Sequence, residues 1–307
     1  MDIHYRGENQ CQARLAKGGE CQNKSYFNTN GVLKCGVHSK KDVGRLELLV
    51  NPNSEERLKI FNERRRQTIL SLQDTNRILG RPGKVITTKL RMMKAPERLD
   101  SYISVFPNFR SGQQTDGVLE FRMPNLSPMK IPVGHEQPGL PPSKNLENFH
   151  QGNKVFASEV DSMGSPLPIW YERRLAMYND EIPHRHKLGK TKAEHMKAAK
   201  CVDNANICLY SIIVLPNGKT ERISYVDSRK YYCRFYEEGV KNTSEYKQLQ
   251  QYLEDGYNLQ IFGYDAYPID EKENITKHYN DPGLPFGHEM VLYTMLTLTP
   301  SQYPWKQ

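Results

Sequence analysis

The feature that most constrains the fold of this chain is a set of four residues near its N-terminus whose side chains are common metal ligands. Cys11, Cys21, Cys35 and His38 are separated by nine, thirteen and two residues. The Cys-x2-His pair places two ligands within one tight turn, and two further thiolates would complete a tetrahedral Cys3His zinc site. Because the surrounding segment is too short and polar to bury a core, a metal would supply the missing folding energy. The alternative is ordinary free thiols beside a surface histidine.

The remaining cysteines, Cys201, Cys208 and Cys233, show no paired framework, which is typical of a reducing compartment. The first ten residues lack the apolar region of a signal peptide. The most apolar run, at 206–215, is about half the length of a membrane span. We therefore expect a soluble, intracellular protein that does not bind a membrane.

Positive charge is concentrated in the first 100 residues. They hold 20 Lys and Arg against 11 Asp and Glu, a net charge of +9, whereas residues 101–307 hold 23 against 24, a net charge of −1. A basic half beside a neutral half predicts nucleic acid or another polyanion as the partner of the basic half. The alternative is a solvated surface that serves solubility alone.

Residues 54–79 have the pattern of one long helix, which Gly80 would end. Arg64, Arg65 and Arg66 lie within it and are the candidate nucleic-acid contacts. Three consecutive residues wrap around nearly a full helical turn, so we expect one or two of these side chains to touch phosphate and the others to stay solvated.

Seven prolines fall between residues 101 and 145, which indicates extended or irregular chain. The segment is also rich in Val, Ile, Phe and Leu, so we expect it to pack across the surface of the following domain.

The rest of the chain alternates predicted strands and helices. We expect a β-hairpin with its turn at Asn217-Gly218, helices over 228–241 and 244–255, a short strand over 258–265, and a helix or buried strand over 288–298.

These patterns predict an α+β fold with a small N-terminal zinc module and basic helix, followed by a mixed α/β domain. The expected segments are a Cys3His zinc module (1–43), a basic helical segment (44–100), a proline-rich extended arm (101–153) and an α/β C-terminal domain (154–307).

Polar clusters at the ends of predicted elements supply the candidate catalytic residues, which are Asp227, Arg229, Asp265, His288 and Glu289. Element ends are where α/β proteins assemble their sites. Arg229 could hold a phosphate or carboxylate, and His288 with Glu289 could transfer protons. The alternatives are local: Asp227 caps a helix, Asp265 belongs to a turn, and His288 and Glu289 only begin a helix.

A second metal site is a further hypothesis. His184 and His186 would share one face of a strand, with His195 and Asp180 as additional ligands, but the basic context HRHKLGKTK favours a loop that contacts anions. The chain contains no Walker loop, no dinucleotide-binding glycine fingerprint, no HExxH and no G-x-S-x-G motif, which removes several enzyme classes.

The stretch from Phe156 through EIPHRHKLG, YVDSRKYYCRFYE, GYNLQIFGYDAYP and PFGHEMVLYTML is similar to uncharacterised proteins of nucleocytoplasmic large DNA viruses. Several members of that family pair such a domain with an N-terminal Cys/His finger. The resemblance implies a viral protein made in the host cytoplasm, or packaged in the virion, and implies no catalytic role for any residue.

The leading hypothesis is a zinc-containing, nucleic-acid-associated protein of a large DNA virus, whose C-terminal domain carries an unidentified activity. The second is an enzyme that acts on a nucleotide or nucleic acid through that domain. The third is a virion structural protein whose proline-rich arm binds other virion proteins.

Overall fold

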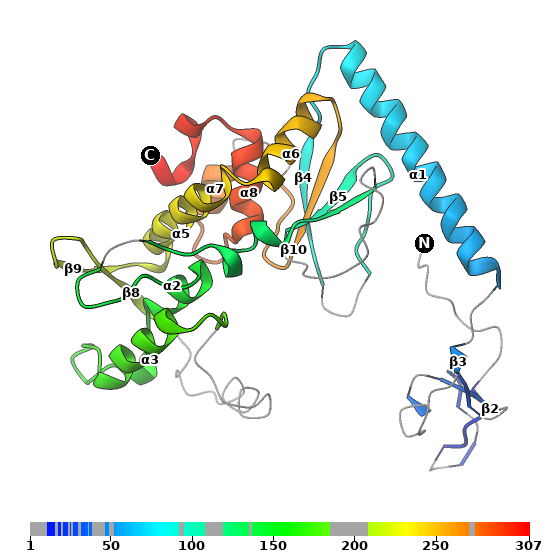
Figure 1. The fold of residues 1–307 in the computed structure, drawn as a ribbon. Coiled ribbons are helices and arrows are strands. Elements are labelled where there is room, and N and C mark those ends of the chain that lie inside the picture. The colour runs from blue at the N-terminus through cyan, green and yellow to red at the C-terminus, as the bar shows by residue number, and fades with distance from the viewer. Residues whose placement is uncertain are drawn as a thin grey trace. The chain divides into compact units, whose positions relative to one another are not determined.

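The computed structural model describes residues 11–15, 18–19, 21–23, 25, 27–29, 32–35, 37–38, 47–48, 52–91, 95–107, 119–134, 137–184, 208–269 and 274–307 (Figure 1). The chain forms two compact units, Met1–Thr68 and Ile69–Gln307. The expected α+β fold is confirmed, with helices and both parallel and antiparallel strands.

The N-terminal unit contains a small antiparallel sheet in the order β2-β1-β3. Its strands are β1 (Phe27–Thr29), β2 (Val32–Lys34) and β3 (Glu47–Leu48). The predicted long helix is α1 (Pro52–Ile78), which is continuous across the division between the two units. Gly80 follows it with φ of +61°, a conformation that favours glycine after a helix end.

The larger unit is built around a parallel sheet in the order β4-β10-β5-β6. The strands are β4 (Val85–Lys89), β10 (Leu259–Gly263), β5 (Ile103–Phe106) and β6 (Glu120–Arg122). Leu259 and Ile261 on one face join the main core, whereas Phe262 on the other face stacks on Phe106 with ring centroids 4.7 Å apart. Because all four strands are parallel, their carboxyl ends lie at one edge of the sheet.

The strands of this sheet show that the predicted boundaries of the basic segment, the arm and the C-terminal domain are wrong. β5 and β6 come from the expected surface arm, and β4 comes from the expected basic helical segment, so the larger unit begins at residue 69 and not at 154. Ile103 and Val105 are fully buried within the core. The sequence does not reveal β5 because a strand that is buried on both faces is a short apolar run without alternating polar residues. Pro107 lies directly after β5 and does not interrupt it.

The larger unit also contains helices, one of which packs against this sheet (Figure 1). They are α2 (Leu146–Gly152), α3 (Pro168–Asn179), α5 (Tyr225–Val240), α6 (Ser244–Glu254), α7 (Asn274–Asn280) and α8 (His288–Thr297). α8 packs against β4 and β10, and α5 packs against α8. The apolar run that begins at His288 is therefore a buried helix. None of the helices in the described parts of the chain is long and apolar enough to cross a membrane.

An antiparallel sheet in the order β7-β8-β9 completes the larger unit. Its strands are β7 (Lys154–Phe156), β8 (Cys208–Val214) and β9 (Thr220–Ile223). The predicted hairpin is confirmed, and Gly218 has φ of +82° in its turn. The second strand ends before residue 224 because the Ser224 side chain caps α5.

Candidate functional site

The four predicted metal ligands converge in the N-terminal unit. The ligand atoms of Cys11, Cys21, Cys35 and His38 all lie within 4.8 Å of one another. Cys21 Sγ is 4.0 Å from Cys35 Sγ, and His38 Nδ1 is 3.3 Å from Cys35 Sγ and 3.5 Å from Cys11 Sγ. A tetrahedron with zinc–sulfur bonds of about 2.3 Å has sulfur–sulfur edges of about 3.8 Å. The donor set and its spacing therefore fit a tetrahedral metal ion.

Hydrogen bonds of the backbone bring together the segments that carry the four candidate ligands. Cys11 N donates to Asn23 O at 2.9 Å, and Cys35 N donates to Cys11 Sγ at 3.2 Å. Burial alone would raise the pKa of Cys35, but hydrogen bonds from the backbone of His38 and Val37 and from neighbouring side chains lower this pKa to about 6. A thiolate at neutral pH is the form that ligates a metal.

The arginine triplet in α1 does not form one basic face. Arg64 is exposed, Arg65 is only 3% exposed, and Arg66 is half-buried with its Nε 3.5 Å from a carboxylate oxygen of Glu63. The three side chains differ in exposure, as expected for consecutive residues of a helix, but the burial of Arg65 contradicts the expectation that the arginines that do not touch phosphate stay solvated. Of the three, Arg64 is the one that is exposed for contact with phosphate.

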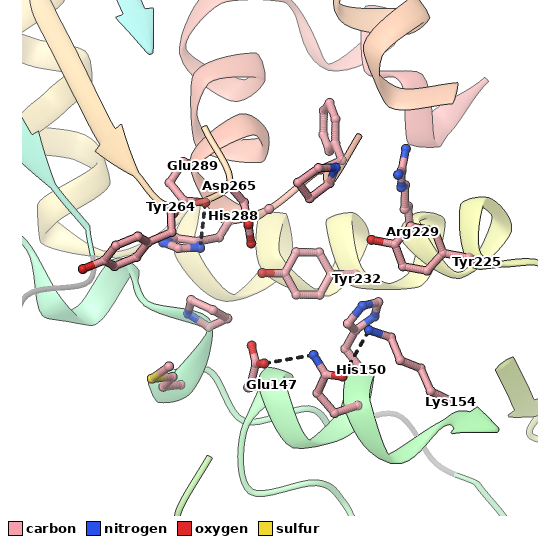
Figure 2. Close-up of a pocket in the computed structure, with 16 residues that line it drawn as sticks. Glu147, His150, Lys154, Tyr225, Arg229, Tyr232, Tyr264, Asp265, His288 and Glu289 are labelled. Carbon is pink, nitrogen blue, oxygen red and sulfur yellow. Dashed lines mark hydrogen bonds and ion pairs between the residues drawn. The ribbon is translucent and has the colours of Figure 1, made fainter. Parts of the chain in front are cut away.

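The second candidate site is a cavity of about 280 Å³ in the larger unit, at the carboxyl end of β10 (Figure 2). Its wall combines the two residues after β10, the first turn of α8, one side of α2, the start of β7 and the first two turns of α5. The lining side chains that carry polar groups are Glu147, His150, Gln151, Lys154, Tyr225, Arg229, Tyr232, Tyr264, Asp265, His288 and Glu289. In α/β proteins, the carboxyl edge of a parallel sheet is where ligands usually bind.

Three of the predicted catalytic residues form one wall of this cavity. His288 Nδ1 is 3.2 Å from Glu289 Oε2, and these side chains are 8% and 2% exposed. Two glycines permit this arrangement: a Cβ on Gly263 would lie 2.0 Å from Glu289 Oε1, and a Cβ on Gly287 would lie 2.8 Å from the Asp265 Cβ. The Glu289 carboxylate is thus held beside the imidazole of His288.

Arg229 also lines the cavity, but its contacts differ from the predicted anion-binding role. Its two η nitrogens donate to the backbone carbonyls of Tyr279 and Leu284, and the guanidinium lies 4.9 Å from the centre of the Tyr225 ring. Arg229 is 2% exposed. It therefore fixes the segment between α7 and α8, because its fork is engaged by carbonyl groups of the protein.

Asp227 lies outside the cavity, which corrects its assignment to the site. It is exposed, its Oδ2 accepts from Ser224 N at 3.3 Å, and its own N donates to Ser224 Oγ at 3.0 Å. This is a reciprocal capping box at the start of α5. The local explanation is the correct one for this residue.

Sequence reasoning missed the opposite wall of the cavity, which α2 and β7 provide. Glu147, His150 and Gln151 follow the spacing i, i+3 and i+4, which places them on one side of α2, and Lys154 begins β7 two residues after that helix ends. The helical spacing is a usable signal, but the prolines before it favour extended chain up to residue 153. Tyr232 lies between the two walls in Figure 2.

Burial shifts the pKa values of two side chains that line the cavity, Tyr232 and Lys154. Burial, followed by the charges of Glu147 and Glu289, raises the pKa of Tyr232 well above its usual value, so its hydroxyl remains a donor. Burial lowers the pKa of Lys154. Strongly perturbed groups that line a cavity are typical of functional sites.

The histidine-rich segment is described only in part. His184 Nε2 lies 2.7 Å from Asp180 Oδ2, while His186 and His195 lie outside the described residues. Within the described parts of the chain, the four N-terminal ligands form the group that could hold a metal ion, and the carboxylates and histidines of the cavity do not form such a group.

Comparison of the chain with protein-family models, with curated proteins and with solved structures gives no match. Its function therefore has to be inferred from the two sites themselves.

Proposed function

We propose that the chain is a zinc-containing protein whose basic N-terminal part binds nucleic acid or another polyanion. The observation that carries the zinc assignment is the convergence of Cys11, Cys21, Cys35 and His38 within 4.8 Å. Three thiolates and one imidazole favour zinc over magnesium or calcium, which prefer oxygen ligands. Four protein ligands fill the coordination sphere, so the ion would stabilise the fold and not react with a substrate.

The charge distribution supports the nucleic-acid partner. Residues 1–100 have a net charge of +9, and Arg14, Lys59 and Arg64 are exposed within the described part of this region. Contacts between such side chains and phosphate position a protein on nucleic acid without reading its sequence. The sequence resemblance to proteins of large DNA viruses supports this proposal, and on that resemblance we propose the host cytoplasm or the virion as the location of the protein.

Salt dependence of binding tests the polyanion proposal. The logarithm of affinity for duplex DNA should fall with the logarithm of salt concentration at a slope of about −0.9 per phosphate contacted. Arg64→Ala should make this slope less steep. Arg234→Ala is the matched control, because Arg234 is a half-exposed helical arginine in the larger unit, ion-paired with Glu238. Equal slopes for both variants, or binding that does not depend on salt, would contradict the proposal.

A second candidate function is acid–base catalysis in the cavity of the larger unit. The observation that favours it is that Asp265, His288 and Glu289 meet there, opposite Glu147 and Lys154. A nucleotide or other small substrate that binds there should raise the melting temperature of the wild-type chain, and His288→Asn should remove turnover but leave the fold intact. The third hypothesis, a binding arm of a virion protein, loses its motivating feature because β5 and β6 belong to the central sheet.

A further inference from the structure

Lys154 carries a buried amine in the wall of the cavity. Within the described residues, the side chain that accepts a hydrogen bond from this amine is neutral. The residue is 8% exposed, and its Nζ donates to Gln151 Oε1 at 3.1 Å. Within the described residues, no carboxylate oxygen lies within ion-pair distance of this nitrogen. Gln151 also links it to Glu147, because Gln151 Nε2 donates to Glu147 Oε1 at 3.1 Å. Buried charges in proteins are usually paired or neutralised, so this amine needs an explanation.

The position of Lys154 is fixed by its own backbone. Its carbonyl oxygen accepts from Trp170 Nε1 at 2.9 Å and from Arg173 Nη2 at 2.6 Å, and the residue pairs with Ser211 in the β7–β8 ladder. The side chain extends along the wall of the cavity near His150 and Tyr225 (Figure 2). A reactive group on a rigid strand is better positioned than one on a loop.

The charges around Lys154 come from four directions. Glu147 on α2, Asp265 after β10 and Cys208 on β8 favour the ammonium form, and Arg173 on α3 opposes it. Arg173 is itself ion-paired with Glu159 at 2.7 Å. Burial outweighs these charges and lowers the pKa of Lys154. A desolvated lysine of this kind has a larger neutral fraction and is a stronger nucleophile at neutral pH.

The other lining groups indicate the kind of molecule that would bind. Glu147, Asp265 and Glu289 supply carboxylate acceptors, whereas the guanidinium of Arg229 is engaged by backbone carbonyls. Carboxylate acceptors of this kind favour a ligand with several hydroxyl donors.

We propose that Lys154 is a nucleophile that forms an imine with the carbonyl carbon of a small hydroxylated aldehyde or ketone, such as an open-chain sugar. This inference rests on the second candidate function. The amine attacks the carbonyl carbon, a C–N bond forms, and the carbonyl oxygen becomes a hydroxyl group. One proton moves from the nitrogen to this oxygen, and the hydroxyl takes up a second proton and leaves as water while the nitrogen lone pair forms the C=N bond. The resulting iminium nitrogen then loses its remaining proton to give the imine. Asp265 and the His288–Glu289 pair lie in the same cavity and would carry these protons.

Reductive trapping tests the proposal on the intact wild-type chain. D-glyceraldehyde and sodium cyanoborohydride convert an imine into a stable secondary amine, and peptide mass mapping locates it. At pH 7 we expect Lys154 to be modified several-fold faster than Lys219, whose side chain is 67% exposed. The preference for Lys154 should shrink as pH rises, because surface amines then lose their protons too. Lys154→Arg should abolish modification at that position and leave modification of Lys219 unchanged.

Modification of Lys154 at the same rate as Lys219, or more slowly, would overturn the proposal, because that is the behaviour of a buried structural lysine. Thermal stabilisation by glyceraldehyde without an adduct at Lys154 would also overturn the imine, while it would leave acid–base catalysis in the cavity intact. Failure of both stabilisation and trapping would count against the ligand class and the imine together.

Discussion

Replacement of Arg229 by methionine distinguishes a structural role for this guanidinium from an anion-binding one. Two hydrogen bonds from its η nitrogens to the carbonyls of Tyr279 and Leu284 would be lost. Hydrogen bonds from a charged group contribute about 1.5–3 kcal/mol each, and a buried carbonyl left unsatisfied costs about 1–3 kcal/mol. Methionine also removes the desolvation penalty of a guanidinium that is 2% exposed. We therefore expect the free energy of unfolding to fall by about 2–4 kcal/mol.

Urea unfolding followed by tryptophan fluorescence measures this change. Both tryptophans of the chain, Trp170 and Trp305, are buried in the larger unit and report on its unfolding. The midpoint should fall while the slope with denaturant stays unchanged. Arg234→Met is the control on the same helix, since its ion pair with Glu238 is half-exposed on both sides and should contribute less than about 1 kcal/mol.

Equal stability of the Arg229 and Arg234 variants would refute the structural role. Unchanged stability combined with loss of anion binding would restore the role that the sequence suggested for Arg229.

Further predictions concern the metal site, a helix cap, the cavity wall and Lys154. Metal analysis of the purified chain should find about one zinc ion per molecule, and Cys35→Ser should lose it; a metal-free, folded wild-type chain would contradict this. Asp227→Ala removes the acidic partner of the Ser224 capping box and should cost about 0.3–1 kcal/mol of stability. It should leave trapping at Lys154 unchanged, and a loss of trapping would return Asp227 to the site. Gly263→Ala places a Cβ 2.0 Å from the Glu289 carboxylate and should destabilise the fold by about 1–3 kcal/mol in urea unfolding, whereas Gly134→Ala, with open space at its Cβ, should be neutral. The pKa of Lys154 is lowered in the folded state, so the unfolded chain binds more protons than the folded chain. The free energy of unfolding should therefore rise with pH towards the unfolded pKa of about 10.4. Lys154→Met should flatten that rise, and an unchanged pH profile would show that the lysine is not desolvated.

The candidate site was predictable where function depends on local spacing or on the ends of elements. The Cys-x2-His pair brings two ligands together by itself, and the positions of Asp265 and His288 beside predicted element ends were enough to suggest that they meet. Asp227 shows the limit of this reasoning, because an Asp at a helix start satisfies the capping rule whether or not a cavity lies nearby.

Arg229 and Lys154 show what local reasoning could not reach. The partners of Arg229 are carbonyls 50 and 55 residues further along the chain, and no sequence pattern marks a carbonyl as an acceptor. Lys154 follows a helix that the surrounding prolines concealed. Its position depends on contacts with α3 and β8, which come from later parts of the chain.

Local spacing is enough to predict α1, α5, α6 and the β8–β9 hairpin, and the Cys/His cluster, whose ligands lie within 28 residues. The pairing of β10 with β4 and β5, strands more than 150 residues earlier in the chain, became visible only in the folded chain. Parallel pairing leaves little trace in a sequence, because strands buried on both faces carry no alternation and their partners depend on which surfaces pack together. The cavity exists only because that pairing brings α2, α5, α8 and the end of β10 to one edge of the sheet.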